Sequence, residues 1–67
     1  MKTYWYLMRL RPPGPLCQPK KGLLQVIDHP IIHSDMVYNG AVIYDRPLDD
    51  MEIEAYELTT YKTEDAN

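Results

Sequence analysis

A proline-rich segment near the N-terminus limits how this chain can fold more than any other feature. Residues 11–22 read RPPGPLCQPKKG and hold four of the six prolines and two of the three glycines. Proline lacks a backbone donor and pushes the preceding residue into extended geometry, so neither a helix nor a paired strand can run through this segment. We therefore expect a stiff loop, which is either a functional contact or a rigid connector that packs Pro12, Pro13 and Leu16 over an apolar edge.

The length of the chain allows one small domain. Of its 67 residues, 45% are hydrophobic and 25% are charged, values typical of a folded globular protein. We expect a single domain over residues 1–61 and a polar C-terminal tail over residues 62–67. The single cysteine excludes an intramolecular disulfide, and no apolar run approaches the roughly 20 residues of a membrane span. A cytoplasmic protein without a membrane partner is therefore expected.

Residues 3–10 (TYWYLMRL) predict the first strand, because aromatic and aliphatic side chains follow one another without a breaker. The alternation of a strand would place Tyr4, Tyr6, Met8 and Leu10 on one face and Trp5, Leu7 and Arg9 on the other. On both faces the first residues of the strand are apolar. This strand is therefore expected to be central, or to be covered on both sides.

The middle of the chain is compatible with two arrangements. The runs on either side of Asn39-Gly40 are rich in β-branched and aromatic residues, and this dipeptide favours a type I′ hairpin turn. We therefore expect a tight hairpin over residues 36–44. In the alternative, residues 41–46 form a strand and residues 31–38 form a loop.

The clearest local pattern is the start of a helix. Asp49 and Glu52 form a capping box, in which each side chain accepts a hydrogen bond from the backbone N–H of the other. Leu48 and Ile53 are spaced for a hydrophobic staple around this cap. A two-turn helix is therefore expected over residues 50–56.

Two further short strands are expected over residues 23–27 and 57–61. Together the elements give an α+β fold, a small antiparallel sheet of three to five short strands with one two-turn helix packed on it. With six tyrosines, one tryptophan and no phenylalanine, the core must use tyrosine rings whose hydroxyls reach its boundary.

Charge is unevenly distributed along the chain. Residues 1–21 carry five basic residues and no acid, a local charge of +5, whereas residues 22–67 carry two basic residues against ten acids, a local charge of −8. The two parts can form a dipolar surface, or they can fold against each other and cancel. A pI of about 5.1 disfavours direct nucleic-acid binding, which needs clustered Lys and Arg, but allows an acidic face that competes with nucleic acid for a basic partner.

No set of catalytic or metal-binding residues can be assembled from the sequence. His29 and His33 have the spacing of two ligands on one helical face, but Pro30 between them disfavours that helix. Cys17 has two lysines nearby that would favour its thiolate, but no general base accompanies it. We therefore expect no enzymatic activity, no cofactor and no bound metal.

Several short stretches occur together between residues 4 and 58. They are an aromatic strand, Arg11-Pro12-Pro13-Gly14-Pro15, Gln18-Pro19-Lys20, Gly40-Ala41-Val42, Tyr44-Asp45-Arg46-Pro47-Leu48 and Tyr56-Glu57-Leu58. This set resembles a group of small proteins encoded by bacteriophages and prophages, some of which are labelled as related to defence-against-restriction proteins. The resemblance implies a small accessory protein that meets host machinery in the bacterial cytosol. It also favours a protein inhibitor over an enzyme.

Two functions are expected from these observations. The first is a non-enzymatic interaction protein, a phage-encoded modulator or inhibitor of a host defence protein, which occludes a basic site on its protein partner with an acidic face. The second is a small homo-oligomeric structural subunit that adds a strand or an aromatic face to a partner. The residues expected to bind a partner are Asp45, Asp50, Glu54 and Glu57 on the acidic face, Arg11, Lys20 and Lys21 in the proline-rich loop, and Trp5 in the first strand.

Overall fold

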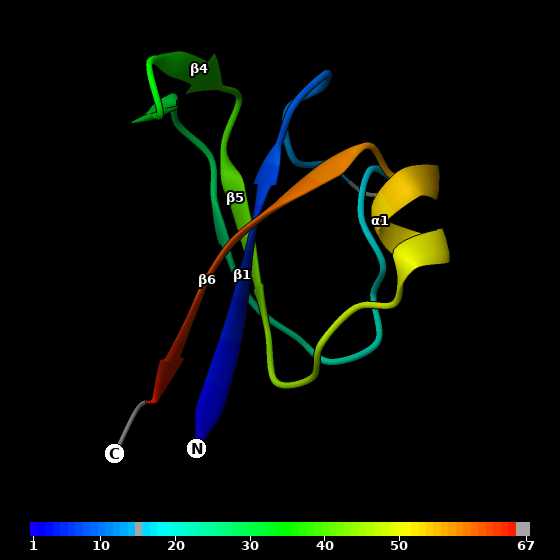
Figure 1. Cartoon of the computed structure of the whole chain (residues 1–67). Helices are drawn as coiled ribbons and strands as arrows, with labels where there is room; N and C mark the ends of the chain where they lie inside the picture. The colour runs from blue at the N-terminus through cyan, green and yellow to red at the C-terminus, as the bar shows by residue number, and fades with distance from the viewer. Residues whose placement is uncertain (15, 66–67) are drawn as a thin grey trace.

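The structure is a computed structural model that describes residues 1–14 and 16–65. Within these residues, one helix accompanies a four-stranded antiparallel sheet and a separate two-stranded hairpin (Figure 1). In chain order the elements are β1 (Lys2–Met8), β2 (Leu23–Ile27), β3 (Ile31–His33), β4 (Met36–Tyr38), β5 (Ala41–Tyr44), α1 (Asp50–Ala55) and β6 (Leu58–Asp65). The predicted α+β class is confirmed, with six short strands in the described chain where three to five were expected.

β1 is a central strand, as its sequence predicts. The strand order of the four-stranded sheet is β2-β5-β1-β6, so β1 pairs on both sides. Tyr6 and Met8 are buried on one face of β1, and Leu7 is buried on the other. The strand ends at Met8, earlier than expected, and Leu10 is 67% exposed.

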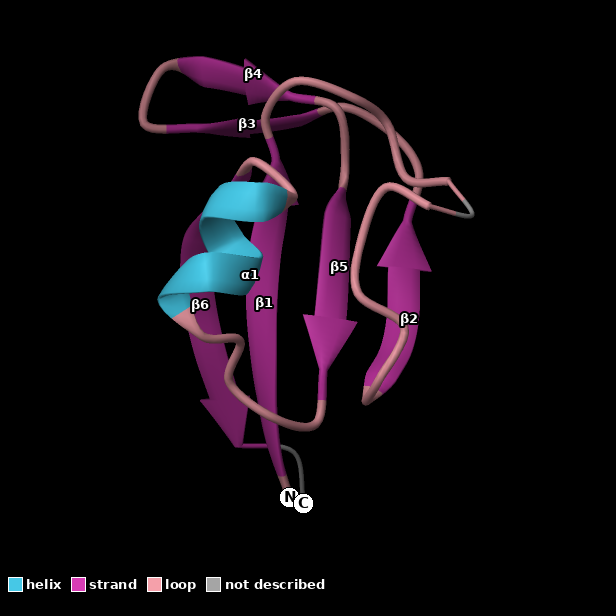
Figure 2. Ribbon diagram, turned by 90° about the vertical axis from the view of Figure 1, so that its right-hand side faces the viewer, coloured by secondary structure: helices cyan, strands magenta, loops and turns pink. Residues whose placement is uncertain are grey.

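Each face of the sheet has its own apolar cluster and its own cover. α1 lies over one face, and the β3–β4 hairpin lies on the other side at one end of the sheet (Figures 1 and 2). The cluster on the α1 side consists of Tyr6, Met8, Val42, Tyr44, Leu48 and Leu58, and the cluster on the hairpin side consists of Leu7, Tyr38 and Ala41. Burial on both faces explains why β1 and β5 are apolar on both sides.

The predicted hairpin over residues 36–44 is wrong, and so is the alternative that left residues 31–38 as a loop. β4 pairs with β3 and not with β5, and the tight turn lies at Ser34-Asp35. Both turn residues have positive φ, 51° at Ser34 and 62° at Asp35, as a type I′ turn requires. Aspartate adopts this backbone conformation more readily than most residues.

Asn39-Gly40 joins the hairpin to the central sheet instead of closing a turn. The Asn39 N–H donates to the Met8 carbonyl, and the Met8 N–H donates to the Gly40 carbonyl, both at 2.9 Å. Gly40 has a φ of 155°, and a Cβ atom at this position would lie 2.4 Å from the carbonyl oxygen of Ile27 in β2. Glycine is therefore required here by the close approach of another strand.

The last strand is longer than the sequence predicts. β6 continues to Asp65, so residues 62–65 pair with β1 and are not a frayed tail. The ladder extends as far as the pair formed by Lys2 and Asp65. Because β1 starts at Lys2, it offers partners to Lys62, Glu64 and Asp65, which have little strand preference of their own. Residues 66–67 of the predicted tail lie outside the described residues.

Candidate functional site

α1 begins at the capping box that the sequence predicts. The Asp49 carboxylate accepts from the Glu52 backbone N–H (2.8 Å), and the Glu52 carboxylate accepts from the Asp49 N–H (3.3 Å). Leu48 and Ile53, the predicted staple pair, both pack into the cluster beneath the helix. The Leu48 N–H also donates to the buried Tyr6 hydroxyl (2.8 Å), which fixes the start of the helix to β1. α1 ends one residue earlier than expected.

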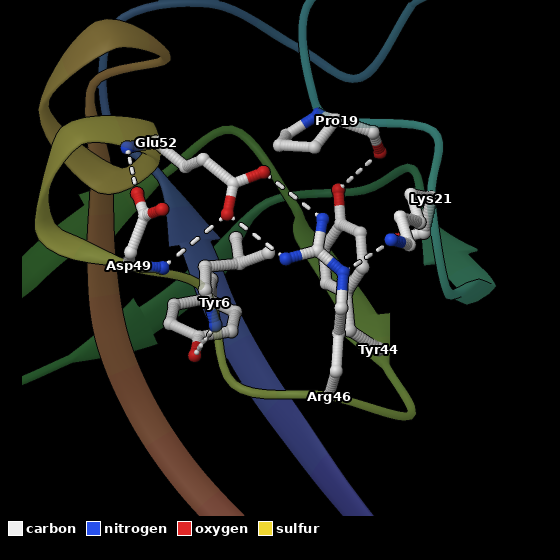
Figure 3. A network of polar contacts seen from close by, with 8 residues as sticks. Tyr6, Pro19, Lys21, Tyr44, Arg46, Asp49 and Glu52 are labelled. Carbon is white, nitrogen blue, oxygen red and sulfur yellow. Dashed lines mark hydrogen bonds and ion pairs between the residues drawn. The ribbon is translucent and has the colours of Figure 1, made fainter.

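Arg46 connects the helix to the proline-rich segment (Figure 3). Its guanidinium donates to both carboxylate oxygens of Glu52 at 2.9 Å, and its Nε donates to the Lys21 carbonyl at 3.0 Å. The hydrogen bonds from Arg46 are the main reason why the pKa of Glu52 falls to about 2. Glu52 is therefore charged at neutral pH, and its charge is neutralised by Arg46 within the fold.

A buried hydrogen bond holds the proline-rich segment against the sheet. The Tyr44 ring is fully buried, and its hydroxyl donates to the Pro19 carbonyl at 2.6 Å (Figure 3). Burial raises the pKa of the Tyr44 hydroxyl above its ordinary value. Gln18 is buried beside Pro19, and its amide oxygen accepts from the Gly14 N–H at 3.2 Å. Residue 15 of this segment lies outside the described residues.

The segment is thus an anchored connector, but the residues that anchor it differ from those expected. Pro12 and Leu16 are exposed, Leu16 to 80%, and Pro13 is half-buried. Gln18 and Pro19 are buried in their place. The anchor depends on a tyrosine hydroxyl and a backbone carbonyl, which the apolar pattern of the segment does not indicate.

The outer side of α1 combines free carboxylates with exposed apolar surface. Asp50 and Glu54 are exposed one helical turn apart, and neither forms an ion pair with a described residue. Met51 follows Asp50 on the same helix and is 81% exposed. We call Asp50, Met51 and Glu54 the acidic face.

The other two predicted acids, Glu57 and Asp45, lie outside the acidic face. Glu57 forms an ion pair with Arg11, so a residue of the expected acidic surface and a residue of the expected basic loop neutralise each other. Asp45 lies at the end of β5, where a Cβ atom at Gly22 would be 2.5 Å from its Oδ1 atom. It is therefore next to the turn that carries Lys21. Charge cancellation therefore occurs at Glu57, whereas Asp45 forms no ion pair with a described residue.

The basic end of the proline-rich segment remains exposed. Lys20 and Lys21 precede β2, and neither ammonium forms an ion pair within residues 1–14 and 16–65. Of the three basic residues predicted to bind a partner, Arg11 alone has its charge paired inside that part of the chain.

Trp5 lies on the face of the sheet opposite α1. Its ring meets the ring of Tyr61 edge-on at 6.5 Å, and Tyr61 packs against the Leu7 cluster. The half-buried Trp5 donates from Nε1 to Thr3 Oγ1 at 3.0 Å, and the Lys62 ammonium lies 4.2 Å from its ring centre. The predicted site residues therefore do not form one continuous surface, and Trp5 is separate from the acidic face.

Two exposed apolar groups were not expected from the sequence. One is Met51, which a helical projection from the capping box would have placed beside Asp50. The other is on the hairpin, where Ile32 (75% exposed) lies directly opposite Val37 (68% exposed). This second group depends on the pairing of β3 with β4, which the sequence does not indicate.

The described side chains do not gather around a metal ion or a cavity. Within residues 1–14 and 16–65, no three His, Cys, Asp or Glu residues are placed to share a metal ion, and no pocket is present. His29 is exposed, whereas the His33 ring packs edge-on against Tyr61 at 4.8 Å. In the same part of the chain, no helix has the length and apolar character needed to cross a membrane.

Comparison with known proteins connects the chain to a family. The family model described as defence against restriction A C-terminal matches residues 1–63. The chain belongs to this family. The match confirms the resemblance that the residues themselves suggest, and the family's name connects this domain with defence against restriction. No curated protein and no solved structure matches the chain.

Proposed function

We propose that this defence-against-restriction domain is a non-enzymatic, phage-encoded protein-binding module that covers a basic site on a host restriction protein in the bacterial cytosol. The acidic face is the observation that supports this function. Its two carboxylates, on Asp50 and Glu54, are exposed and lack an ion-pair partner in the described chain, and Met51 adds apolar surface on the same side of the helix.

The charge of this face fits the kind of partner that the family's name suggests. Restriction proteins act on DNA, and proteins that hold DNA present Lys and Arg to its phosphates. Carboxylates on a protein surface compete with phosphates for such a site. They also accelerate encounter with it, because opposite charges steer association.

Met51 gives the acidic face a component that charge alone does not provide. Its flexible thioether adapts to irregular surfaces, and methionine is enriched at protein interfaces. A contact made only by exposed carboxylates would gain little free energy at physiological salt, because water and ions screen it. Burial of Met51 against the partner would add a contribution that salt does not screen.

The setting of the carboxylates supports the proposal of recognition rather than catalysis. Acid–base catalysis needs a carboxyl group whose pKa is raised by burial or by a neighbouring acid in a confined site. Asp50 and Glu54 are exposed on a helix surface. Their environment suits the binding of positive charge.

Inhibition of DNA cleavage tests this function. The purified domain is added to a panel of purified restriction endonucleases, and the rate of DNA cleavage is measured. We expect the domain to slow at least one enzyme, and we expect Asp50→Lys with Glu54→Lys to abolish the effect.

A matched control changes the same charge elsewhere. Asp28→Lys with Glu64→Lys alters two exposed acids away from α1, and in both double variants the net charge rises by four units from −3. This control should inhibit as the unmodified domain does. The proposed function is wrong if no enzyme in the panel is slowed, or if the two double variants behave alike.

A further inference from the structure

We infer that Asn39-Gly40 is a deamidation site that the folded structure suppresses, so that Asn39 is converted only when the junction between the hairpin and the sheet opens. The dipeptide joins β4 to β5 at the end of the sheet where the hairpin lies (Figure 1). This junction is separate from the acidic face on α1. The inference therefore does not rest on the proposed function.

Deamidation of asparagine is an attack by the chain on itself. The backbone nitrogen of Gly40 loses its proton to water or hydroxide and bonds to the side-chain carbon Cγ of Asn39. The bond from Cγ to Nδ2 breaks, and this nitrogen leaves as ammonia after taking a proton from water. Water then opens the resulting cyclic imide at one of its two carbonyl carbons and leaves either aspartate or isoaspartate in place of Asn39.

The identity of residue 40 makes this position susceptible. Glycine has no side chain, so nothing shields its backbone nitrogen or restricts the rotation that the attack requires. A larger residue would obstruct the attack, but the fold does not admit one. A Cβ atom at Gly40 would lie 2.4 Å from the Ile27 carbonyl oxygen and 3.1 Å from the ring of Pro13. The packing that demands glycine therefore retains a reactive dipeptide.

Three hydrogen bonds restrain the dipeptide in the folded chain. Met8 bonds to both sides of the peptide group, because it accepts from the Asn39 N–H and donates to the Gly40 carbonyl, each at 2.9 Å. The Asn39 side chain donates from Nδ2 to the Arg9 carbonyl at 3.2 Å. The attack requires this side chain to leave the Arg9 carbonyl and the peptide group to turn. These bonds therefore oppose the reaction while the junction is closed.

Burial adds a second form of protection. Gly40 is buried, so a base that takes the proton from its nitrogen has little access. The neighbouring Tyr38 is 6% exposed and packs with Leu7 and Ala41, which fastens the hairpin to the sheet at this point. Local opening of this contact would expose Gly40 and release Asn39 together.

Conversion would prevent the junction from closing as before. Isoaspartate adds a methylene to the backbone between the two groups that bond to Met8, so the two bonds no longer align. Aspartate keeps the backbone but replaces the Nδ2 donor with a carboxylate, which only accepts hydrogen bonds and is repelled by the Arg9 carbonyl. Modified chains should therefore accumulate from the molecules that have opened.

Deamidation of the unmodified domain in buffer and in urea tests the suppression. The increase in mass that follows replacement of –NH2 by –OH is measured over time, and peptide fragmentation assigns it to Asn39. A peptide spanning residues 34–45 corrects for any effect of urea on the chemistry. We expect conversion at least about tenfold faster in urea than in buffer, because opening of the closed junction costs free energy. Equal rates overturn the inference, and so does a lack of conversion in urea.

Two neighbouring substitutions test the role of the hairpin contact. Tyr38→Ala removes the buried ring that fastens the hairpin, whereas Val37→Ala shortens a side chain on the same strand that is 68% exposed. The rate of each variant in buffer is divided by its own rate in urea. This ratio should rise severalfold for Tyr38→Ala and keep its unmodified value for Val37→Ala, and equal ratios overturn the inference. If circular dichroism shows that Tyr38→Ala does not fold, the comparison of the unmodified domain in buffer and in urea decides alone.

Discussion

Removal of one buried hydroxyl should weaken the attachment of the proline-rich segment. Tyr44→Phe keeps the aromatic ring in the core but deletes the hydrogen bond to the Pro19 carbonyl, which has a donor–acceptor distance of 2.6 Å. Tyr44 is fully buried and Pro19 is buried above it, so water cannot readily replace the lost donor. The carbonyl is then left without a partner inside the protein.

The expected cost follows from that geometry. A buried carbonyl that loses its donor costs about 1–3 kcal/mol, more than the net gain of an ordinary hydrogen bond. A domain of this size has a free energy of unfolding of roughly 3–10 kcal/mol, so the loss is a substantial part of the total. It corresponds to a fall in Tm of about 4–8 °C for each kcal/mol.

Urea denaturation followed by fluorescence measures this loss, because Trp5 is the single tryptophan and lies in the central sheet. Tyr4→Phe is the matched control, since Tyr4 packs against the same cluster but does not contact the Pro19 carbonyl through a hydrogen bond. Its hydroxyl bonds to no side chain or carbonyl among the described residues. Equal midpoints for the two variants would refute the view that the Tyr44 hydroxyl anchors the segment.

Three further predictions concern the strand contact, the helix start and pH. Gly40→Ala should lower the free energy of unfolding, because the added Cβ would lie 2.4 Å from the Ile27 carbonyl oxygen. An unchanged urea midpoint would contradict the view that the close approach of β2 requires glycine at this position. Asp49→Ala should lower the free energy of unfolding by about 0.5–2 kcal/mol through loss of the cap, and an unaltered midpoint would contradict the capping box as the helix start. The folded pKa of Glu52 is about 2, below its ordinary value of 4.5, so the stability it provides is complete above that ordinary value and is lost as pH falls towards 2. Thermal midpoints measured across this pH range should fall less steeply for Glu52→Gln, and identical slopes would exclude the Arg46–Glu52 pair as a source of acid sensitivity.

The parts of the fold that depend on neighbouring residues could be predicted from the sequence. The capping box requires only Asp49 and Glu52, three residues apart, and it forms as expected. The central position of β1 follows from an apolar pattern on both of its faces. Each of these signals is contained within a few residues of the element that it specifies.

The parts that depend on distant contacts could not be predicted. Asn39-Gly40 has the composition of a hairpin turn, but the glycine is needed because β2 approaches at Ile27. The ion pair between Arg11 and Glu57 joins residues 46 positions apart, so the sequence alone leaves open whether the acidic and basic segments form separate surfaces or neutralise each other. The acidic face is therefore smaller than the four acids that the sequence predicts, and it includes Met51, which the sequence analysis does not single out.

Association kinetics provide the most direct test of the acidic face as the binding surface. The association rate constant of the domain with the restriction endonuclease that it inhibits is measured at about 50 and at about 150 mM salt. At the higher concentration the screening length is about 8 Å. We expect the association rate of the unmodified domain to fall with salt, and Asp50→Lys with Glu54→Lys to slow association far more than Asp28→Lys with Glu64→Lys does. An association rate that responds neither to salt nor to reversal of the charges on α1 would contradict the account.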